Sequence, residues 1–188
     1  MRLDKRERIL AAAARPIVRH GLQCSMAAIA EEASVATGSL YNHFASKEAL
    51  VLGVYTRVSM EMSERLAAAP ASDGLTLQGE VRRYIELHID FIWEDPDRAR
   101  LFDYLDNTPL ITLTAAKAIF GTHVLHGIAI MEAAQAAGFV RAGPASMIMS
   151  FVRGSIRNAL KRRRQTDGTL AAAEKQVVAD MCWAAIKA

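Results

Sequence analysis

The chain has 188 residues, of which 52% are apolar and 23% are charged, a composition that excludes an intrinsically disordered protein and allows one large domain or two smaller ones. Its formal net charge of +3 is too small to indicate a nucleic-acid-binding protein by itself, although residues 1–48 are slightly more basic than the rest. Its two cysteines lack metal-ligand spacing, which predicts a reduced, cytoplasmic protein. The first apolar stretch stops at Arg15, so a signal peptide is not expected. No apolar run reaches about 18 residues, so no membrane span is predicted.

The spacing of apolar residues predicts an all-α protein. They recur at every third or fourth position almost throughout, and no run of β-branched residues alternates with polar ones. Glycines and prolines divide this pattern into nine predicted helices, at residues 4–20, 26–33, 37–44, 47–68, 77–94, 97–106, 109–137, 144–164 and 169–187. Since the first three are short and the later ones long, we expect a small N-terminal module at residues 1–47 and a larger helical bundle at residues 48–188.

The second and third predicted helices have the features of a helix-turn-helix, in which two short helices are joined by a tight turn. Ser25 is a favourable N-cap for the first of them, and SVA forms the turn before the second, which begins near Thr37. The helix at residues 4–20 can pack beneath both. In such a unit the second helix lies in the DNA major groove and its N-terminal residues contact the bases.

The second of these helices, TGSLYNHF, has a composition that suits DNA better than it suits helix stability, because Gly costs about 1 kcal/mol relative to Ala. Gly38 allows a close approach of the backbone, while Leu40 and Phe44 face the module. Among the remaining side chains, Thr37, Ser39 and Asn42 offer short hydrogen-bonding groups for bases. The side chains of Tyr41, His43 and Lys47 can contact DNA phosphates. Any one of these residues is commonly structural, but together they favour DNA binding.

Residues 9–50 resemble the DNA-binding domain of the TetR family of bacterial transcriptional regulators. The similarity lies in AAA of the first helix, HGL before the second, IAEEASVATGSLYNHF across the turn and SKEAL after it. Beyond them it is limited to the order of long helices and the segment AAGFVRAGPASM. The resemblance implies a homodimer that binds a palindromic operator and a small effector. It also implies base contacts by Thr37, Gly38, Ser39 and Asn42 and phosphate contacts by Ser25, Tyr41, His43 and Lys47.

Three residues depart from the family pattern. Pro16 lies inside the first helix, where the loss of a backbone hydrogen bond predicts a kink or an early end. Ser34 stands at the turn position that is usually glycine, and Ala36 replaces the usual hydroxyl-bearing N-cap. We expect the turn to form, with a weaker cap on the following helix unless Thr37 takes over.

The C-terminal bundle is expected to hold the dimer interface and the effector pocket. The resemblance implies dimerisation through the last two helices, whose apolar stripes include Ile148, Val152, Ile156, Val177, Met181 and Ala184; packing within one chain is the alternative. A pocket among the fourth to eighth helices would suit a hydrophobic small molecule. Its candidate inward-facing residues are Val58, Met62, Tyr84, His88, Phe102, Phe120, His123, Met147 and Phe151, although core packing is the commoner role for any one of them.

Three further features have mainly structural interpretations. His123 and His126 stand three residues apart but lack a third ligand at a suitable spacing, so neither a metal nor another cofactor is predicted. The basic run RNALKRRR ends a helix, where cations favour the helix dipole and solvation is expected. Cys24 has no firm cationic neighbour in sequence that would make it a redox switch.

These features predict a ligand-responsive transcriptional regulator. It would be a repressor released from a palindromic operator by a small hydrophobic effector, with the fourth helix as the lever, and no membrane partner is expected. The alternatives are a DNA-binding regulator that needs no effector, an activator, and a helical enzyme. The enzyme is disfavoured because the sequence has no spaced nucleophile and base, no phosphate-binding loop and no metal motif.

Overall fold

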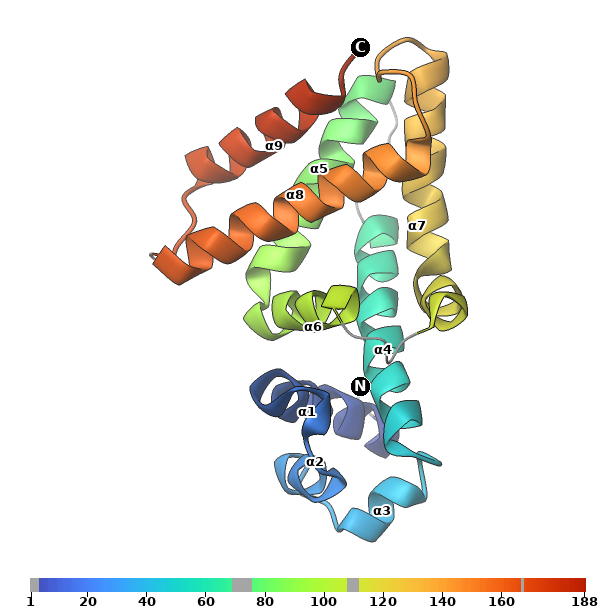
Figure 1. Cartoon of the computed structure of the whole chain (residues 1–188), viewed down its shortest axis with the longest axis vertical. Helices are drawn as coiled ribbons and strands as arrows, with labels where there is room; N and C mark the ends of the chain where they lie inside the picture. Colours follow the sequence, from blue (N-terminus) through green and yellow to red (C-terminus); the bar gives the residue numbers. More distant parts are fainter. Residues whose placement is uncertain (1–3, 69–75, 108–111, 167) are drawn as a thin grey trace. The chain divides into compact units, whose positions relative to one another are not determined.

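The computed structural model describes residues 4–68, 76–107, 112–166 and 168–188. Within these ranges the chain consists of α-helices, one short 3-10 helix and turns, with a single isolated β-bridge (Figure 1), which confirms the predicted all-α class. The elements are α1 (Lys5–His20), η1 (Gly21–Gln23), α2 (Met26–Glu32), α3 (Thr37–Tyr41), α4 (Lys47–Ala68), α5 (Leu77–Glu94), α6 (Pro96–Asn107), α7 (Leu113–Ala136), α8 (Ala145–Thr166) and α9 (Ala172–Ile186). None of the helices in the described ranges is long and apolar enough to cross a membrane.

Two predicted helix boundaries differ from the structure by several residues. α3 ends at Tyr41 rather than at residue 44, because the amides of His43 and Phe44 both donate to the Leu40 carbonyl and close a turn there. α9 begins at Ala172 rather than at residue 169. Its start is fixed by the Glu174 carboxylate, which accepts a hydrogen bond from the amide of Ala171 at 2.8 Å. Part of the predicted helix 109–137 lies outside the described residues, at 109–111.

The described residues form two compact units, Met1–Glu61 with Pro96–Gly121 and Met62–Asp95 with Thr122–Ala188. α4 and α7 each contribute residues to both units. These two units group residues that pack together. The boundary at residue 47, by contrast, separates a DNA-binding module from a ligand-binding and dimerisation bundle, and it stays a prediction.

The first unit has a core formed mainly by α1 and the first turns of α4. Burying one such Ile or Leu side chain contributes about 1.5–3 kcal/mol. Two tyrosines tie further segments to this core: the Tyr55 hydroxyl donates to the Leu101 carbonyl at 2.9 Å, and the Tyr104 hydroxyl donates to the Val18 carbonyl at 3.2 Å. The fully or nearly fully buried residues of α1 and α4 include Ile9, Leu10, Ala13, Ile17, Leu50, Val51 and Val54.

Pro16 does not end α1, which continues to His20. The early end, one of the two outcomes expected from the sequence, is therefore wrong. Proline removes one backbone hydrogen bond from a helix interior. Here Pro16 is itself buried beside Ile17 and Val18, so the packing of this face against the unit offsets that loss.

In the second unit α5, α8 and α9 contact one another, as Figure 1 shows. The basic end of α8 belongs to this packing. The Arg164 guanidinium donates to the carbonyls of Ile92 and Trp93, at 3.1 and 2.7 Å, and lies 4.6 Å from the centre of the Trp93 ring. It thereby caps the C-terminal carbonyls of α5. Arg163 pairs with Glu174 at 2.8 Å, so this part of RNALKRRR is less solvated than expected.

The end of α9 is joined to the loop between α7 and α8. Val140 and Lys187 form the antiparallel bridge, flanked by hydrogen bonds from the Arg141 amide to the Ile186 carbonyl and from the Ala188 amide to the Phe139 carbonyl, at 2.9 and 3.1 Å. This is the short extended piece expected within AAGFVRAGPASM. It fixes the last turn of α9 to its own unit.

Candidate DNA-binding surface and buried polar cluster

The second helix of the module starts at its predicted N-cap. The Ser25 hydroxyl oxygen accepts a hydrogen bond from the Ala28 amide at 3.1 Å, which satisfies one of the four unpaired amides of a helix N-terminus and is worth about 1 kcal/mol. Ile29 and Ala30 are buried on the inner face of α2. Ser25 itself is exposed, so its hydroxyl hydrogen remains available to a phosphate oxygen.

The turn between α2 and α3 forms despite the absence of glycine. Ser34 has φ of 53° and is the non-glycine residue with positive φ in the described structure. The Ser34 amide donates to the Glu31 carbonyl at 3.0 Å, and the Val35 amide to the Ala30 carbonyl at 2.9 Å. For a residue with a Cβ atom the left-handed conformation costs about 1–2 kcal/mol, so this turn stores strain.

Ser34→Gly should therefore stabilise the protein. Glycine adopts positive φ without that cost but loses more backbone entropy on folding, so we expect the free energy of unfolding to rise by about 0.5–1 kcal/mol. Denaturant unfolding at neutral pH measures the change. Ser34→Ala is the matched control, since it keeps the Cβ atom and should give no gain; equal stabilisation by the two variants would contradict the strain argument.

α3 is anchored by one residue and otherwise faces outward. Leu40 is fully buried, and Phe44 just beyond the helix is nearly so. Ala36 provides no side-chain cap, so the cap is weak as expected, and Thr37 does not replace it. The helix has only five residues and depends on packing rather than on its own propensity.

The predicted DNA-contacting residues lie on the outer side of this anchor. Tyr41 is 56% exposed, so its ring projects from the module rather than packing into it. A Cβ atom added at Gly38 would meet no atom within 4 Å, so packing inside the chain does not require a glycine there. The exposed residues of the set are Ser25, Thr37, Gly38, Tyr41, Asn42 and His43, and the half-buried ones are Ser39 and Lys47.

Two basic side chains that sequence reasoning missed lie beside α3. The Lys5 ammonium is 3.5 Å from the Ser39 hydroxyl, and the Arg6 guanidinium lies 5.3 Å from the centre of the Phe44 ring. Both residues come from the first turn of α1. They add positive charge next to the exposed face of α3, and the basic start of α1 was the signal for them.

Cys24 is buried next to this surface. Burial raises the pKa of the Cys24 thiol, and the nearby positive charge of Lys47 opposes that rise only in part. The thiol is therefore the stable form at neutral pH, and a redox role is disfavoured, as expected from the sequence.

A short exposed helix held by a buried leucine, preceded by a capped helix and a tight turn, defines a DNA-binding protein of the helix-turn-helix class. A family model described as bacterial regulatory proteins, tetR family, matches residues 9–54. A TetR-family transcription regulator from Marinobacter aquaeolei VT8 has a similar structure, with a TM-score of 0.85 and 21% identity over 97% of this chain and 95% of that one. One from Haemophilus influenzae Rd gives 0.81 and 22%, over 98% and 97%. Residues 9–54 therefore match the DNA-binding helix-turn-helix of the tetR family, and the chain has the fold of TetR-family transcription regulators.

The pocket candidates predicted from the sequence are divided between the two compact units. Val58, Phe102 and Phe120 belong to the first unit, where the two phenylalanine rings lie 5.9 Å apart. Met62 is buried in the second unit. Tyr84 and His88 of α5 and His123 of α7 are buried there as well. Three of the nine candidates thus form a buried polar cluster.

The polar cluster is centred on His88. Its ring is stacked on that of Tyr84, with centroids 6.4 Å apart and planes 7° apart. Neither ring nitrogen has a hydrogen-bond partner among the residues that the structure describes. Gly127 of α7 makes room for the Tyr84 hydroxyl group and the end of the Met149 side chain. A Cβ atom at Gly127 would lie 2.8 Å from both the Tyr84 hydroxyl oxygen and the Met149 terminal carbon.

Burial and neighbouring charge keep both histidines neutral. Burial, assisted by the positive charges of Arg153, Arg157 and His123, lowers the pKa of His88 to about 3. Burial, with Arg153, lowers the pKa of His123 to about 4. The pKa of Tyr84 is raised by burial, with Arg153 acting in the opposite direction. The cluster is electropositive because of Arg153 rather than because of its histidines.

The two apolar faces of α8 are the reverse of those expected. Ile148, Val152 and Ile156 are buried inside the chain, so their prediction as dimer contacts is wrong. Met147 and Phe151, predicted to face inward, are 67% and 53% exposed, so that prediction is wrong as well. When a helix is apolar on two adjacent faces, the apolar residues of both faces recur with the same helical spacing. The sequence pattern alone therefore does not tell which face packs into the core of its own chain.

α9 exposes the apolar face that was predicted. Val177 is 56% exposed and Met181 67%, and Ala184 is exposed too. We call these residues, together with the exposed Met147 and Phe151 of α8, the α8–α9 face. Large apolar side chains exposed on one face are candidates for an interaction site.

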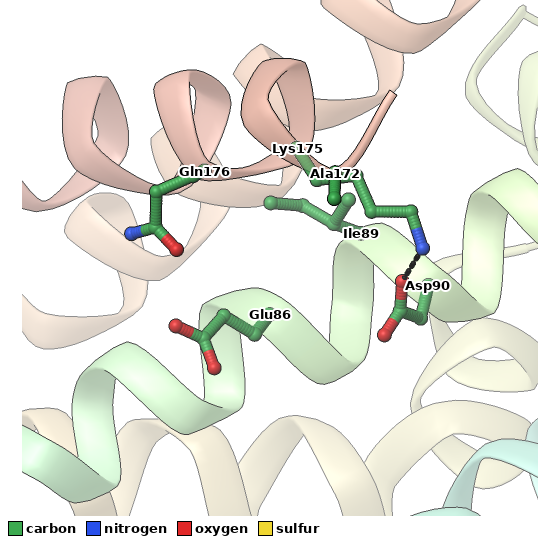
Figure 2. Close-up of a pocket in the computed structure, with 6 residues that line it drawn as sticks. All are labelled: Glu86, Ile89, Asp90, Ala172, Lys175 and Gln176. Carbon is green, nitrogen blue, oxygen red and sulfur yellow. Dashed lines mark hydrogen bonds and ion pairs between the residues drawn. The ribbon is translucent and has the colours of Figure 1, made fainter. Parts of the chain in front are cut away.

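A further hollow of about 210 Å³ lies between α5 and α9, and sequence reasoning missed it. Figure 2 shows Glu86 and Asp90 from α5 opposite Lys175 and Gln176 from α9, with Lys175 paired to Asp90. Ile89 and Ala172 complete its lining. Its charged walls differ from the apolar pocket expected for a hydrophobic effector. Across the described ranges, no group of three or more His, Cys, Asp or Glu side chains could hold a metal ion.

Proposed function

We propose that this regulator binds a palindromic operator as a homodimer and acts as a repressor that a small molecule releases. The observation that supports operator binding most directly is the outer face of α3, where short polar side chains surround the buried anchor Leu40. No catalytic activity is part of the proposal. The localisation it implies is the cytoplasm, where the DNA lies.

Base recognition is assigned to Thr37, Ser39 and Asn42, and phosphate contacts to Tyr41, His43 and Lys47. An amide such as that of Asn42 donates to and accepts from one base edge, whereas a hydroxyl or ammonium on a phosphate carries no sequence information. The unpaired amides at the N-termini of α2 and α4 favour phosphate oxygens as well. Ser25 and Ser46 cap these helices, each accepting a hydrogen bond from the amide three residues on, at 3.1 and 3.2 Å.

Selection of bound fragments from a random DNA pool tests operator binding. We expect a palindrome whose half-sites lie about one helical turn apart, since a two-fold dimer presents its reading helices at that spacing. Failure to enrich any palindrome would overturn the proposal. The selected sequence also supplies the probe for the experiments below.

Asn42→Ala and Tyr41→Phe separate the two kinds of contact. Asn42→Ala removes a base contact, so it should relax the preference at one base pair of each half-site, worth about 1–3 kcal/mol. Tyr41→Phe removes only a phosphate hydroxyl, so it should weaken binding to all sequences about equally. Competition binding with single-base variants of the selected operator measures both. Identical specificity profiles for the two variants would contradict these roles.

We assign dimerisation to the α8–α9 face. Its exposed residues are large and apolar, with Phe151 and Met181 prominent among them, and a two-fold axis would bury each copy against the same residues of its partner. Four helices would then form the interface. The small residues Gly154 and Ala184 beside them would let the helices approach closely.

The effector is assigned to the second unit, at the buried polar cluster. A ligand releases the operator only by binding the non-operator conformation more tightly, because equal affinity for two states shifts neither. α4 carries residues of both units and is continuous with the end of the helix-turn-helix. It is therefore the element through which we expect ligand binding to alter the DNA-binding module.

A further inference from the structure

His88 is a buried group whose hydrogen-bonding capacity is unused. Only 3% of its surface is exposed, and both ring nitrogens lack a partner within the described part of the chain. Buried polar groups in native proteins are nearly always satisfied, so an unsatisfied one points to a missing ion or molecule or to a functional role. A neutral imidazole can donate one hydrogen bond and accept another. The missing partner therefore has a group that accepts from an N–H.

The charges that act on His88 at neutral pH are positive, and they come from Arg153 and Arg157 of α8. His123 of α7 is neutral at that pH, because burial lowers its pKa to about 4. α8 contains no Asp or Glu. Several acidic groups of the packed helices pair with other residues: Asp90 with Lys175, Asp180 with Arg82, and Glu174 with Arg163. Glu86 on α5 lines the hollow beside α9. Positive potential around an unused donor favours an anionic ligand.

The surface next to these donors is apolar. The Tyr84 hydroxyl stands beside Gly127 and the end of the buried Met149 side chain. An inorganic anion would leave this surface uncovered. An organic acid can place its charged end on the donors and its hydrocarbon on the apolar side chains.

We infer that the effector is a carboxylic acid with an apolar body, and that His88, Tyr84 and Arg153 bind its carboxylate. A carboxylate accepts hydrogen bonds on both oxygens, from the imidazole N–H, the phenol and the guanidinium, and such charge-assisted bonds are about twice as strong as neutral ones. Buried Met149 gives the hydrocarbon an adaptable neighbour. The inference rests on the proposed function, since it uses the unit assigned there to the effector.

Octanoate and benzoate are the probes, with 1-octanol and benzyl alcohol as matched neutral compounds and acetate as an acid without an apolar body. Calorimetric titration and thermal unfolding of the full chain measure their binding. We expect one or both apolar acids to bind and to raise the unfolding temperature by several degrees at saturation, and the other three compounds to do neither. Absence of binding by both acids, or equal binding by their neutral counterparts, would overturn the inference.

Two variants locate the carboxylate. His88→Phe and Arg153→Gln should each weaken acid binding by about 10- to 100-fold, whereas His126→Phe, at an exposed histidine of α7, should leave it unchanged. His88→Phe removes an unsatisfied buried group, so the free variant should be no less stable than the wild type. Retained acid affinity in both variants would place the ligand elsewhere and overturn the assignment; if His88→Phe does not fold, Arg153→Gln decides.

Operator binding is measured on the same samples with the selected palindrome. If the wild type binds no palindrome, the proposed function fails, and the titrations still decide whether the cluster binds an acid. If the palindrome is bound but neither acid binds, the inference alone fails. Release of bound operator by octanoate or benzoate, lost in Arg153→Gln, would support both.

Discussion

Phe151→Glu combined with Met181→Glu will leave the protein folded but monomeric, and its affinity for the palindromic operator will fall by about 100-fold or more. Both side chains are more than half exposed, so the new carboxylates disturb no packing within the chain. In the proposed dimer they would be buried in pairs near the two-fold axis, where like charges without partners are strongly unfavourable. Each monomer then binds a half-site without the help of the second.

Light scattering after size exclusion gives the oligomeric state, and operator titration gives the affinity. Met60→Glu is the matched control, because Met60 is also an exposed methionine, 58% exposed, but belongs to α4 in the first unit. It should remain dimeric. A double glutamate variant that is still a dimer would show that the α8–α9 face is not the interface.

Acidification should destabilise the protein through its two buried histidines. Their pKa values in the folded state are about 3 for His88 and about 4 for His123, against about 6.5 in the unfolded chain. The unfolded state therefore binds more protons as the pH falls below 6.5, and stability that is complete above that pH is lost towards pH 4. Between pH 7 and pH 4.5 the two histidines should remove about 4–5 kcal/mol, a large part of an ordinary domain's 5–15 kcal/mol.

Urea denaturation at the two pH values tests this. In the variant that combines His88→Gln and His123→Gln, most of the loss in unfolding free energy between pH 7 and pH 4.5 should disappear, because neutral amides do not titrate. His126→Gln, at an exposed position, should leave the difference as it is in the wild type. Parallel pH dependences for the wild type and the double variant would mean that these histidines are protonated in the folded protein.

The sequence was sufficient for the helix-turn-helix because its signals are local. Ser25 capping α2 and Leu40 facing inward follow from the residues within one or two turns of them. The conformation of Ser34 could also be anticipated, since the turn geometry leaves few alternatives to positive φ. The basic start of α1 was visible in the sequence, but the proximity of Lys5 to Ser39 depends on how α1 and α3 pack in the module, which no local pattern encodes.

The C-terminal helices could be located from the sequence but not oriented. The positions of α5, α8 and α9 follow from breakers and apolar spacing, yet the interior and exterior faces of α8 were exchanged. Ile148 and Met147 are equally suited to a core or to an interface, and the choice depends on how neighbouring helices pack. The lack of hydrogen-bond partners for the His88 ring nitrogens in the described structure could not be predicted from the sequence either, because such a partner can come from any element of the fold.

The double use of α8 has a consequence for how this protein can change over generations. One side of the helix carries Ile148, Val152 and Ile156 into the core, and the next carries Met147 and Phe151 to the exposed face. Its end is held by Arg163 and Arg164. Exposed positions outside both sets, such as Ser146, Ser150 and Asn158, are those at which substitutions disturb neither. Sequence drift in α8 should therefore concentrate at these positions, and with the proposed interface a new dimerisation specificity would require changes in both α8 and α9.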